Sequence, residues 1–243
     1  MINVNCDLGE GLNNEHVIMP LINSCNIACG GHAGDSQSMI ECVEISIKNE
    51  VEIGAHPSYP DKENFGRKKI DISRSELYYS LTDQIERLNS IALSYGKKLH
   101  HIKAHGALYN QMFTDKDLSD FYLETIKGFK KECYIYIPYN SEIEKSALEK
   151  GFKIMYEAFG DRAYNDNLSL VSRNMKGALI NTPKLVIDQI ASIIDSKKIK
   201  SINDKYKSIK ADTICIHSDT DNSIIIINFF IIYHFYFVNY FIN

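Results

Sequence analysis

The sequence predicts an α/β fold in which seven parallel strands alternate with helices. The chain has 243 residues, a length at which α/β barrels commonly form one domain. Seven short apolar runs are separated by longer segments with helical periodicity, and parallel strands need long crossover connections of this kind. Ionisable residues stand just after six of the seven runs, which is where parallel α/β folds place their chemistry.

The predicted strands are short apolar runs bounded by polar or glycine-containing segments. They cover residues 2–6, 24–29, 51–55, 99–104, 133–138, 152–156 and 213–216. Periodicity alone does not distinguish a closed seven-stranded barrel from an open, doubly wound sheet. In both folds, the carboxyl ends of the strands form the functional edge.

Three helices are predicted between these strands. The clearest begins after Ser73, which forms a capping-box pattern with Glu76, and its apolar residues recur every three or four positions. Gly96 marks its end. A second helix is predicted over 36–49, with Asp35 or Ser36 as its cap, and a third over 183–195.

Composition narrows the range of partners and compartments. The net charge is −4, whereas nucleic-acid binding usually requires an excess of Lys and Arg. The six cysteines form no C-x-x-C pair and no signal peptide is apparent, so free, buried thiols in the cytoplasm are expected. We expect neither a nucleic-acid partner nor a membrane partner.

The final segment differs from the rest of the chain. We predict one barrel domain over residues 1–221, followed by an aberrant, uncharged apolar tail over 222–243. The tail contains no Asp, Glu, Lys or Arg, whereas the last crossover helix of a barrel should be amphipathic. Its length would suit a membrane span, but no basic residue flanks it and asparagines interrupt it.

Two motifs follow the first two strands. Asp7 and Glu10 lie three residues apart in a glycine-containing loop, where they could share acid–base work or bind a cation; a solvated turn is the alternative. His32 lies among Gly30, Gly31 and Gly34, which suggests close approach of the backbone to a ligand. The alternative is a tight turn with a hydrogen-bonded histidine.

Two further motifs follow the third and fourth strands. His56 begins a proline-containing loop that ends at Arg67, whose guanidinium could bind a substrate carboxylate; a surface loop without a role is the alternative. His101, Lys103 and His105 alternate along the fourth strand and should share one face. If that face is the interior, burial should disfavour the charged form of Lys103; otherwise this is a solvent-facing edge strand.

The later strands complete a ring of ionisable residues. Glu157, Asp161 and Arg162 follow the sixth strand, and His217 follows the seventh. The chain has no G-x-S-x-G nucleophile elbow, phosphate loop or G-x-G-x-x-G fingerprint, so the mechanisms that use those motifs are not supported.

Six segments taken together resemble the LamB/YcsF family: NCDLGEG, NIACGGHAGD, GAHPSYPDKENFGR, HIKAHGALYN, EAFGDRAY and CIHSD. The resemblance covers residues 2–221 and implies a seven-stranded parallel β/α barrel similar to the glycoside hydrolase and deacetylase barrels. It also implies hydrolysis of the lactam 5-oxo-L-proline to L-glutamate with cleavage of ATP, bound with Mg²⁺, in a complex with subunits B and C. The family usually has Cys-x-His-Gly-Asp near its end, and here Ser218 replaces the glycine.

This chemistry assigns roles to the ionisable residues. Asp7 and His105 would act as base or hold a metal, and Lys103 and His32 would stabilise developing negative charge. Arg67 or Arg162 would hold the substrate carboxylate. The full predicted substrate-binding set is Glu10, His56, Arg67, Glu157, Asp161, Arg162 and His217.

Two other functions fit the same residues. One is a metal-dependent amide or acetyl hydrolase, in which Asp7, His56 and His105 hold a divalent metal that activates water. The other is a non-catalytic subunit whose pocket only binds the lactam. Metal content and turnover distinguish these functions from an ATP-dependent hydrolase.

Overall fold

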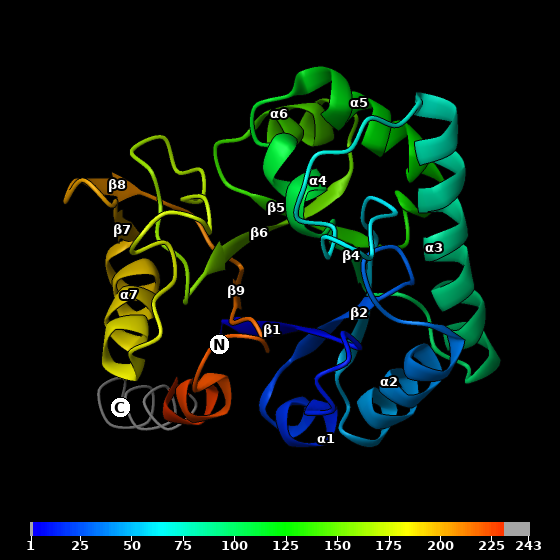
Figure 1. The fold of residues 1–243 in the computed structure, drawn as a ribbon, viewed down its shortest axis with the longest axis horizontal. Helices are drawn as coiled ribbons and strands as arrows, with labels where there is room; N and C mark the ends of the chain where they lie inside the picture. The colour runs from blue at the N-terminus through cyan, green and yellow to red at the C-terminus, as the bar shows by residue number, and fades with distance from the viewer. Residues whose placement is uncertain (1, 231–243) are drawn as a thin grey trace.

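The computed structural model describes residues 2–230 and shows a closed barrel of seven parallel strands (Figure 1). The first strand pairs with both the second and the last, which closes the sheet. The barrel strands, in order around the barrel, are β1 (Asn3–Leu8), β2 (Ser24–Ala28), β3 (Glu52–His56), β4 (His101–Ile102), β5 (Tyr134–Pro138), β6 (Lys153–Phe159) and β9 (Thr213–Cys215). The prediction of a seven-stranded barrel is confirmed.

The ends of the strands differ from the predicted ends in a way that matters for the site. Strand β1 continues to Leu8 and β6 to Phe159, so Asp7 and Glu157 lie within strands rather than after them. Strand β4 is shorter than predicted. The backbone N–H groups of His100 and Lys103, which flank β4, nevertheless donate hydrogen bonds to carbonyls of β3, so the pairing with β3 extends beyond both ends of β4.

Helices surround the barrel on its outside (Figure 1). Apart from a helical segment over 223–230, the helices within the described residues are α1 (Glu15–Ile18), η1 (Met19–Leu21), α2 (Ser36–Lys48), α3 (Arg74–Ser94), α4 (Gly106–Gln111), α5 (Lys116–Thr125), η2 (Lys127–Phe129), α6 (Glu142–Glu149) and α7 (Pro183–Ser196). All three predicted helices are present. Asp35 caps α2, and Ser73 and Glu76 form the predicted capping box of α3.

The two faces of the strands differ in polarity. On β1, Val4, Cys6 and Leu8 belong to the hydrophobic core, which also includes apolar residues of the surrounding helices. Their neighbours Asn5 and Asp7 alternate with them and point into the barrel. All six cysteines are buried free thiols, as predicted.

The barrel interior holds a buried network of polar side chains. Asn5 donates to Thr213 Oγ1 at 2.7 Å, and Asn26 donates to Asn5 Oδ1 at 2.7 Å. His101 Nε2 lies 2.7 Å from Asn26 Oδ1, and the His101 ring stacks on Tyr136 with centroids 3.9 Å apart. Buried polar groups are stable only when they are hydrogen-bonded, and this network provides those bonds below the functional end.

Gly54 makes room for this network, and adding a methyl group there should disrupt it. A Cβ at Gly54 would lie 2.0 Å from Nε2 of His101. We expect Gly54→Ala to lower the free energy of unfolding by about 1–3 kcal/mol, because overpacking displaces the ring. Denaturant unfolding measures the loss. The matched control is Gly128→Ala, since no atom lies within 4 Å of its added Cβ, and equal stability of the two variants would contradict the prediction.

A hairpin outside the barrel was not predicted from the sequence. An antiparallel hairpin of β7 (Lys198–Lys200) and β8 (Tyr206–Ser208) follows α7. Its strands are three residues long and rich in lysine, so they lack an apolar run that would mark them. The hairpin lies outside the barrel and beside α7 (Figure 1).

The predicted tail begins with a helical segment. Residues 223–230 are helical, and Ile226, Ile227 and Phe230 are buried in the hydrophobic core. Ser218, which replaces the family's glycine, donates to the backbone carbonyl of Asp7 at 2.7 Å. Residues 231–243 of the tail lie outside the described residues, and the domain boundary at 221 stays a prediction. Among residues 2–230, no helix is both long enough and apolar enough to cross a bilayer.

Candidate active site

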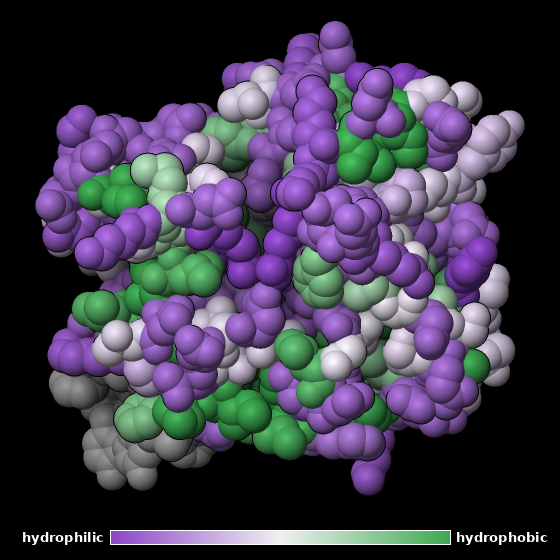
Figure 2. Space-filling model, in the orientation of Figure 1, coloured by the Kyte–Doolittle hydropathy of each residue, from purple (hydrophilic) through white to green (hydrophobic). Residues whose placement is uncertain are grey.

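A cavity of about 670 Å³ opens at the carboxyl ends of the barrel strands. Figure 2 shows hydrophilic residues around a hollow near the middle of this face. The predicted site residues that line the cavity are Asp7, His56, Arg67, Lys103, His105, Arg162 and His217. The other four, Glu10, His32, Glu157 and Asp161, each contact one of these lining residues.

Lys103 is buried at the cavity floor between two carboxylates. Its ammonium group lies 2.8 Å from Asp7 Oδ1 and 2.9 Å from Glu157 Oε1. The thiol of Cys215 lies 3.2 Å away. Asp7 comes from β1 and Glu157 from β6, so barrel closure brings the three charges together.

The charge state of Lys103 differs from the one that the sequence predicted. Burial lowers the pKa of Lys103, but Asp7, Cys215 and Glu157 more than offset this effect and raise it well above its ordinary value. The prediction that the charged form of Lys103 would be disfavoured overall is therefore wrong. Lys103 is a fixed positive charge, suited to stabilising an anion rather than to transferring a proton.

Asp7 is held as an anion by its surroundings. Burial raises the pKa of Asp7, but His56 and Lys103 outweigh this and hold it well below its usual range. Its Oδ1 also accepts a hydrogen bond from Asn26 at 2.7 Å. Its Oδ2 lies 3.3 Å from His56 Nε2 and 4.0 Å from His217 Nε2. This second oxygen therefore faces two histidines that line the cavity.

Two histidines have their ring protons fixed by backbone carbonyls. His56 Nδ1 lies 2.8 Å from the carbonyl of Lys103, and His105 Nε2 lies 2.9 Å from the carbonyl of Phe65. Because a carbonyl only accepts, each of these nitrogens carries a hydrogen. The opposite nitrogens, His56 Nε2 and His105 Nδ1, face each other at 3.0 Å. Burial is the main reason that the pKa of His105 is well below its usual range, so its ring is neutral.

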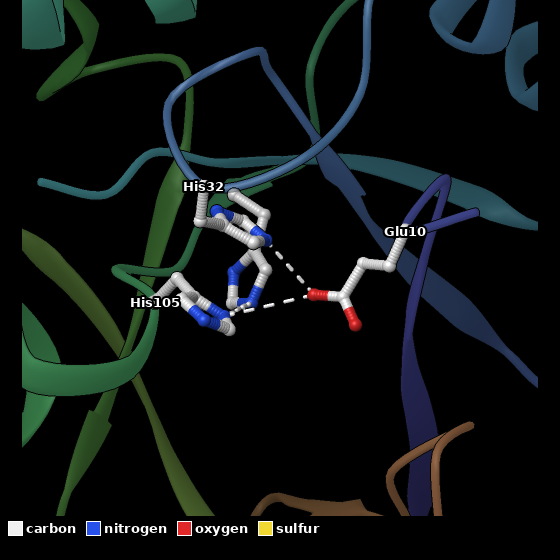
Figure 3. A group of neighbouring side chains, drawn as sticks. Glu10, His32 and His105 are labelled. Carbon is white, nitrogen blue, oxygen red and sulfur yellow. Dashed lines mark hydrogen bonds and ion pairs between the residues drawn. The ribbon is translucent and has the colours of Figure 1, made fainter. Parts of the chain in front are cut away.

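His32 and Glu10 both contact the His105 ring. The rings of His32 and His105 are stacked, with centroids 3.6 Å apart and an interplanar angle of 2°. Glu10 reaches across from the loop after β1, and its Oε1 lies 2.9 Å from His32 Nε2 and 3.6 Å from His105 Nδ1 (Figure 3). His32 thus contacts other site residues rather than the cavity.

Glycines allow the loops of the site to approach one another. Gly66 has φ +60°, and a Cβ there would lie 2.9 Å from His32 Cβ and 3.0 Å from His105 Cδ2. A Cβ on Gly31 would lie 2.3 Å from the Gln84 side chain. The glycine at position 31 therefore serves packing within the protein rather than the approach of a ligand that the sequence suggested.

Asp161 fixes the position of His217. Its carboxylate accepts from the backbone N–H of His217 at 2.9 Å and from Thr220 Oγ1 at 2.5 Å, and lies 3.0 Å from His217 Nδ1. Burial raises the pKa of Asp161, but His217 and Thr220 outweigh it and lower the pKa below its ordinary value. The pair leaves His217 Nε2 directed at the Asp7 side of the cavity.

This depressed pKa predicts a pH dependence of stability. The ionised Asp161 stabilises the fold above the unfolded pKa of about 4, and this contribution is lost as the pH falls through the lower folded pKa. We expect Asp161→Asn to be less stable than the parent at pH 7, with a gap that narrows below about pH 4. Denaturant unfolding across pH measures the gap. The exposed Asp83→Asn is the control, and a gap that stays constant with pH would contradict the prediction.

Two arginines line the cavity in different environments. Arg67 forms an ion pair with Asp219 and lies over the Phe65 ring. Arg162 is buried, and Nη2 donates to the carbonyl of Val171 at 2.7 Å. Burial is the main reason that the pKa of Arg162 is lowered to about 10, which still leaves it charged. Arg162 forms no ion pair with a carboxylate of residues 2–230, so it is the better suited of the two to an anionic ligand.

Several site residues were missed in the sequence. Asn26 and Cys215 contact Asp7 and Lys103 directly, and Arg173 and Tyr109 also line the cavity. The alternation of β1, extended to β2 and β9, could have identified Asn26 and Cys215 as inward-facing. Arg173 and Tyr109 lie in a loop and a helix that carry no such signal.

A smaller cavity of about 260 Å³ adjoins the main one. It shares Tyr109, Phe159 and Leu170 with the main cavity and reaches Glu157 on the other side. Glu157 therefore lies between the ammonium group of Lys103 and this second space.

Two groups of side chains in the described residues are arranged closely enough to hold a metal. One consists of Glu10, His32, His56 and His105, and the other of Asp7, Cys215 and His217. The predicted metal set was Asp7, His56 and His105. The structure places its two histidines in the first group and its carboxylate in the second.

Comparison with known proteins agrees with the resemblance seen in the sequence. The A subunit of 5-oxoprolinase from Acinetobacter baumannii (strain ACICU) is 38% identical over 228 residues, which cover 92% of this chain and 90% of that protein. The corresponding protein of Bacillus cytotoxicus is 36% identical over the same share. The crystal structure of a lactam utilization protein from Thermus thermophilus has a TM-score of 0.88 at 28% identity and covers 96% of each chain. The family model for LamB/YcsF matches residues 2–230, and this chain therefore belongs to the LamB/YcsF family.

Proposed function

We propose that this chain is the A subunit of an ATP-dependent 5-oxoprolinase, which hydrolyses the lactam 5-oxo-L-proline to L-glutamate. The observation that carries the proposal is the charged Lys103 held between Asp7 and Glu157 at the floor of a cavity about 670 Å³ in volume. Relatives that align over 92% of the chain bear the name of this subunit. The volume is sufficient for a small cyclic amide.

The chemistry requires an anion to be stabilised and water to be activated. Phosphorylation of the lactam oxygen by ATP makes the ring carbon electrophilic. Water adds to this carbon, the carbon–nitrogen bond breaks as the nitrogen takes a proton, and a second water releases phosphate from the resulting acyl phosphate. The products are glutamate, ADP and phosphate. Positioned charges and a general base supply most of the catalysis in such a reaction.

The site residues suit these steps. Asp7 is the proposed base, because its Oδ2 faces the cavity while Oδ1 is held by Lys103 and Asn26. Lys103 is the proposed stabiliser of negative charge on the oxygen. His105, at the wall of the cavity, is proposed to assist Asp7 as base. His32 positions His105 by stacking on its ring rather than by contact with the substrate.

The substrate carboxylate is assigned to the arginine side of the cavity. Arg162 is the proposed partner, because Arg67 is already paired with Asp219. His56 and His217 line the same cavity. Glu10, Glu157 and Asp161 act through the lining residues that they contact. ATP, with Mg²⁺, is the proposed cosubstrate of the assembled enzyme with subunits B and C, since this chain has no phosphate-loop motif.

The test is an assay of glutamate and ADP formation from 5-oxoproline and ATP. The chain is assayed alone and with its two partner subunits, and ATP-dependent glutamate formation is expected from the complex. Lactam binding by calorimetry without turnover in the complex would instead support a non-catalytic subunit. Glutamate formation by the chain alone, without ATP and lost on chelation, would support the metal-dependent hydrolase.

A further inference from the structure

The ring nitrogens of two histidines that do not face a backbone carbonyl converge in the site. His56 Nδ1 and His105 Nε2 each carry a hydrogen that is donated to a backbone carbonyl, of Lys103 and of Phe65. In neutral rings, His56 Nε2 and His105 Nδ1 then both present lone pairs, and these atoms lie 3.0 Å apart. Two lone pairs at this distance repel unless a proton on one nitrogen or a metal cation lies between them.

Carboxylates surround the same point. Glu10 Oε1 lies 3.6 Å from His105 Nδ1, and the ligand atoms of Glu10, His56 and His105 all lie within 4.8 Å of one another. Asp7 Oδ2, 3.3 Å from His56 Nε2, adds negative charge beside them. Two nitrogens about 2.1 Å from one tetrahedral ion lie about 3.4 Å apart, so the two rings, now 3.0 Å apart at these atoms, need to separate by only a few tenths of an ångström to bind it.

His32 is excluded as a ligand by its ring orientation. Its ring is parallel to that of His105 and stacked on it, so an ion in the plane of one ring lies well out of the plane of the other. Its Nε2 instead contacts Glu10 at 2.9 Å and positions that carboxylate (Figure 3).

We propose that His56 Nε2, His105 Nδ1 and the carboxylate of Glu10 bind a divalent cation of the zinc class. Two imidazoles and one carboxylate form a ligand set typical of catalytic zinc sites that keep a position open. Backbone carbonyls that fix the tautomer of each histidine are the usual outer support of such ligands. His56 and His105 line the cavity, so the open position faces the space where the substrate would bind.

The second group of possible ligands already contains a cation. The ammonium group of Lys103 lies 2.8 Å from Asp7 and 3.2 Å from Cys215, and it fills the place that an ion would take among Asp7, Cys215 and His217. Under this proposal, the ammonium group of Lys103 is the cation beside Asp7 and Cys215, and a divalent ion is the cation beside Glu10, His56 and His105.

The ion deepens the proposed function, on which this part of the inference rests. A divalent cation at this point lowers the pKa of a bound water. Asp7, 3.3 Å from His56, is close enough to accept that proton. The water that opens the lactam would then come from the side of His56 and His105.

The test uses the purified chain and Co²⁺ as a spectroscopic probe for zinc. We expect one Co²⁺ per chain, visible d–d absorption and no thiolate-to-cobalt charge-transfer band, because the ligands are nitrogen and oxygen. Zinc should displace the cobalt. Glu10→Gln should lower the affinity by about 100-fold or more, since even losing an outer support of a ligand costs about 10–100-fold. His56→Gln is the second variant, and circular dichroism verifies that each variant is folded.

Cys215→Ser is the matched control, because it removes the only sulfur of the second group. It should keep the full Co²⁺ stoichiometry. Folded protein that binds no Co²⁺, or binding that survives Glu10→Gln and is lost in Cys215→Ser, would overturn the proposal. The readout is independent of turnover: one bound Co²⁺ in a complex that forms no glutamate supports the cation site and rejects the proposed function.

Discussion

Replacing Lys103 with methionine is expected to abolish glutamate formation and to lower the free energy of unfolding by about 3–5 kcal/mol. The ammonium group is buried and pairs with Asp7 and Glu157, so its removal leaves two carboxylates without a counter-charge. Urea unfolding measures the stability and the coupled assay measures the activity. The two effects have one cause, the loss of the only fixed positive charge at this floor of the barrel among the described residues.

Two further variants separate charge repulsion from loss of packing. Lys184→Met removes an exposed lysine that pairs with Asp188 and should leave stability unchanged within error, because surface pairs contribute little. Adding Glu157→Gln to Lys103→Met should recover part of the lost stability without recovering activity. A Lys103→Met protein as stable as the parent would rule out the buried ion-pair cluster.

Replacing Asp7 with asparagine is expected to lower kcat about 10²- to 10⁴-fold while KM changes little. Asparagine retains an oxygen that can accept from Lys103 and Asn26, so the barrel interior keeps its shape. What disappears is the carboxylate that faces His56 and the cavity. Steady-state kinetics of the assembled enzyme measures both constants.

The exposed Asp188→Asn on α7 is the control for this substitution. It should leave both kinetic constants at the parental values, since within residues 2–230 Asp188 forms its ion pair with the exposed Lys184 alone. If Asp7→Asn retained a kcat close to that of the parent, another group would have to be the base. A rise in KM at constant kcat would instead assign Asp7 to substrate binding.

Much of the fold could be predicted from local patterns. The strands were visible as apolar runs because the outward face of each strand meets helices, and α3 was visible through the capping box of Ser73 and Glu76. Barrel closure was not visible, because local periodicity carries no information on the pairing of β1 with β9, which lie at opposite ends of the chain. The hairpin of β7 and β8 was missed because its short strands are mostly polar and contain a single buried apolar residue, Ile199.

The sequence predicted which residues belong to the site but not the charge state of Lys103. The rule that functional residues follow strand ends predicted that Asp7, His56 and His105 share one cavity, and alternation along the fourth strand added Lys103. The charge of Lys103 depends on two carboxylates from β1 and β6, whose distance from it no local pattern encodes. Inward-facing Asn5 and Asn26 were not predicted, because apolar residues mark a strand, whereas a polar residue between them does not by itself indicate a site.

The hydrogen bond between Asn5 and Thr213 joins side chains 208 positions apart. A growing chain makes Asn5 early and Thr213 late, so the polar lining of the barrel stays open to water until the last barrel strand is made. Contacts this distant in sequence slow folding. During that interval an unfinished barrel exposes the edges of β1 and β6 together, and those edges are where two nascent copies would pair wrongly.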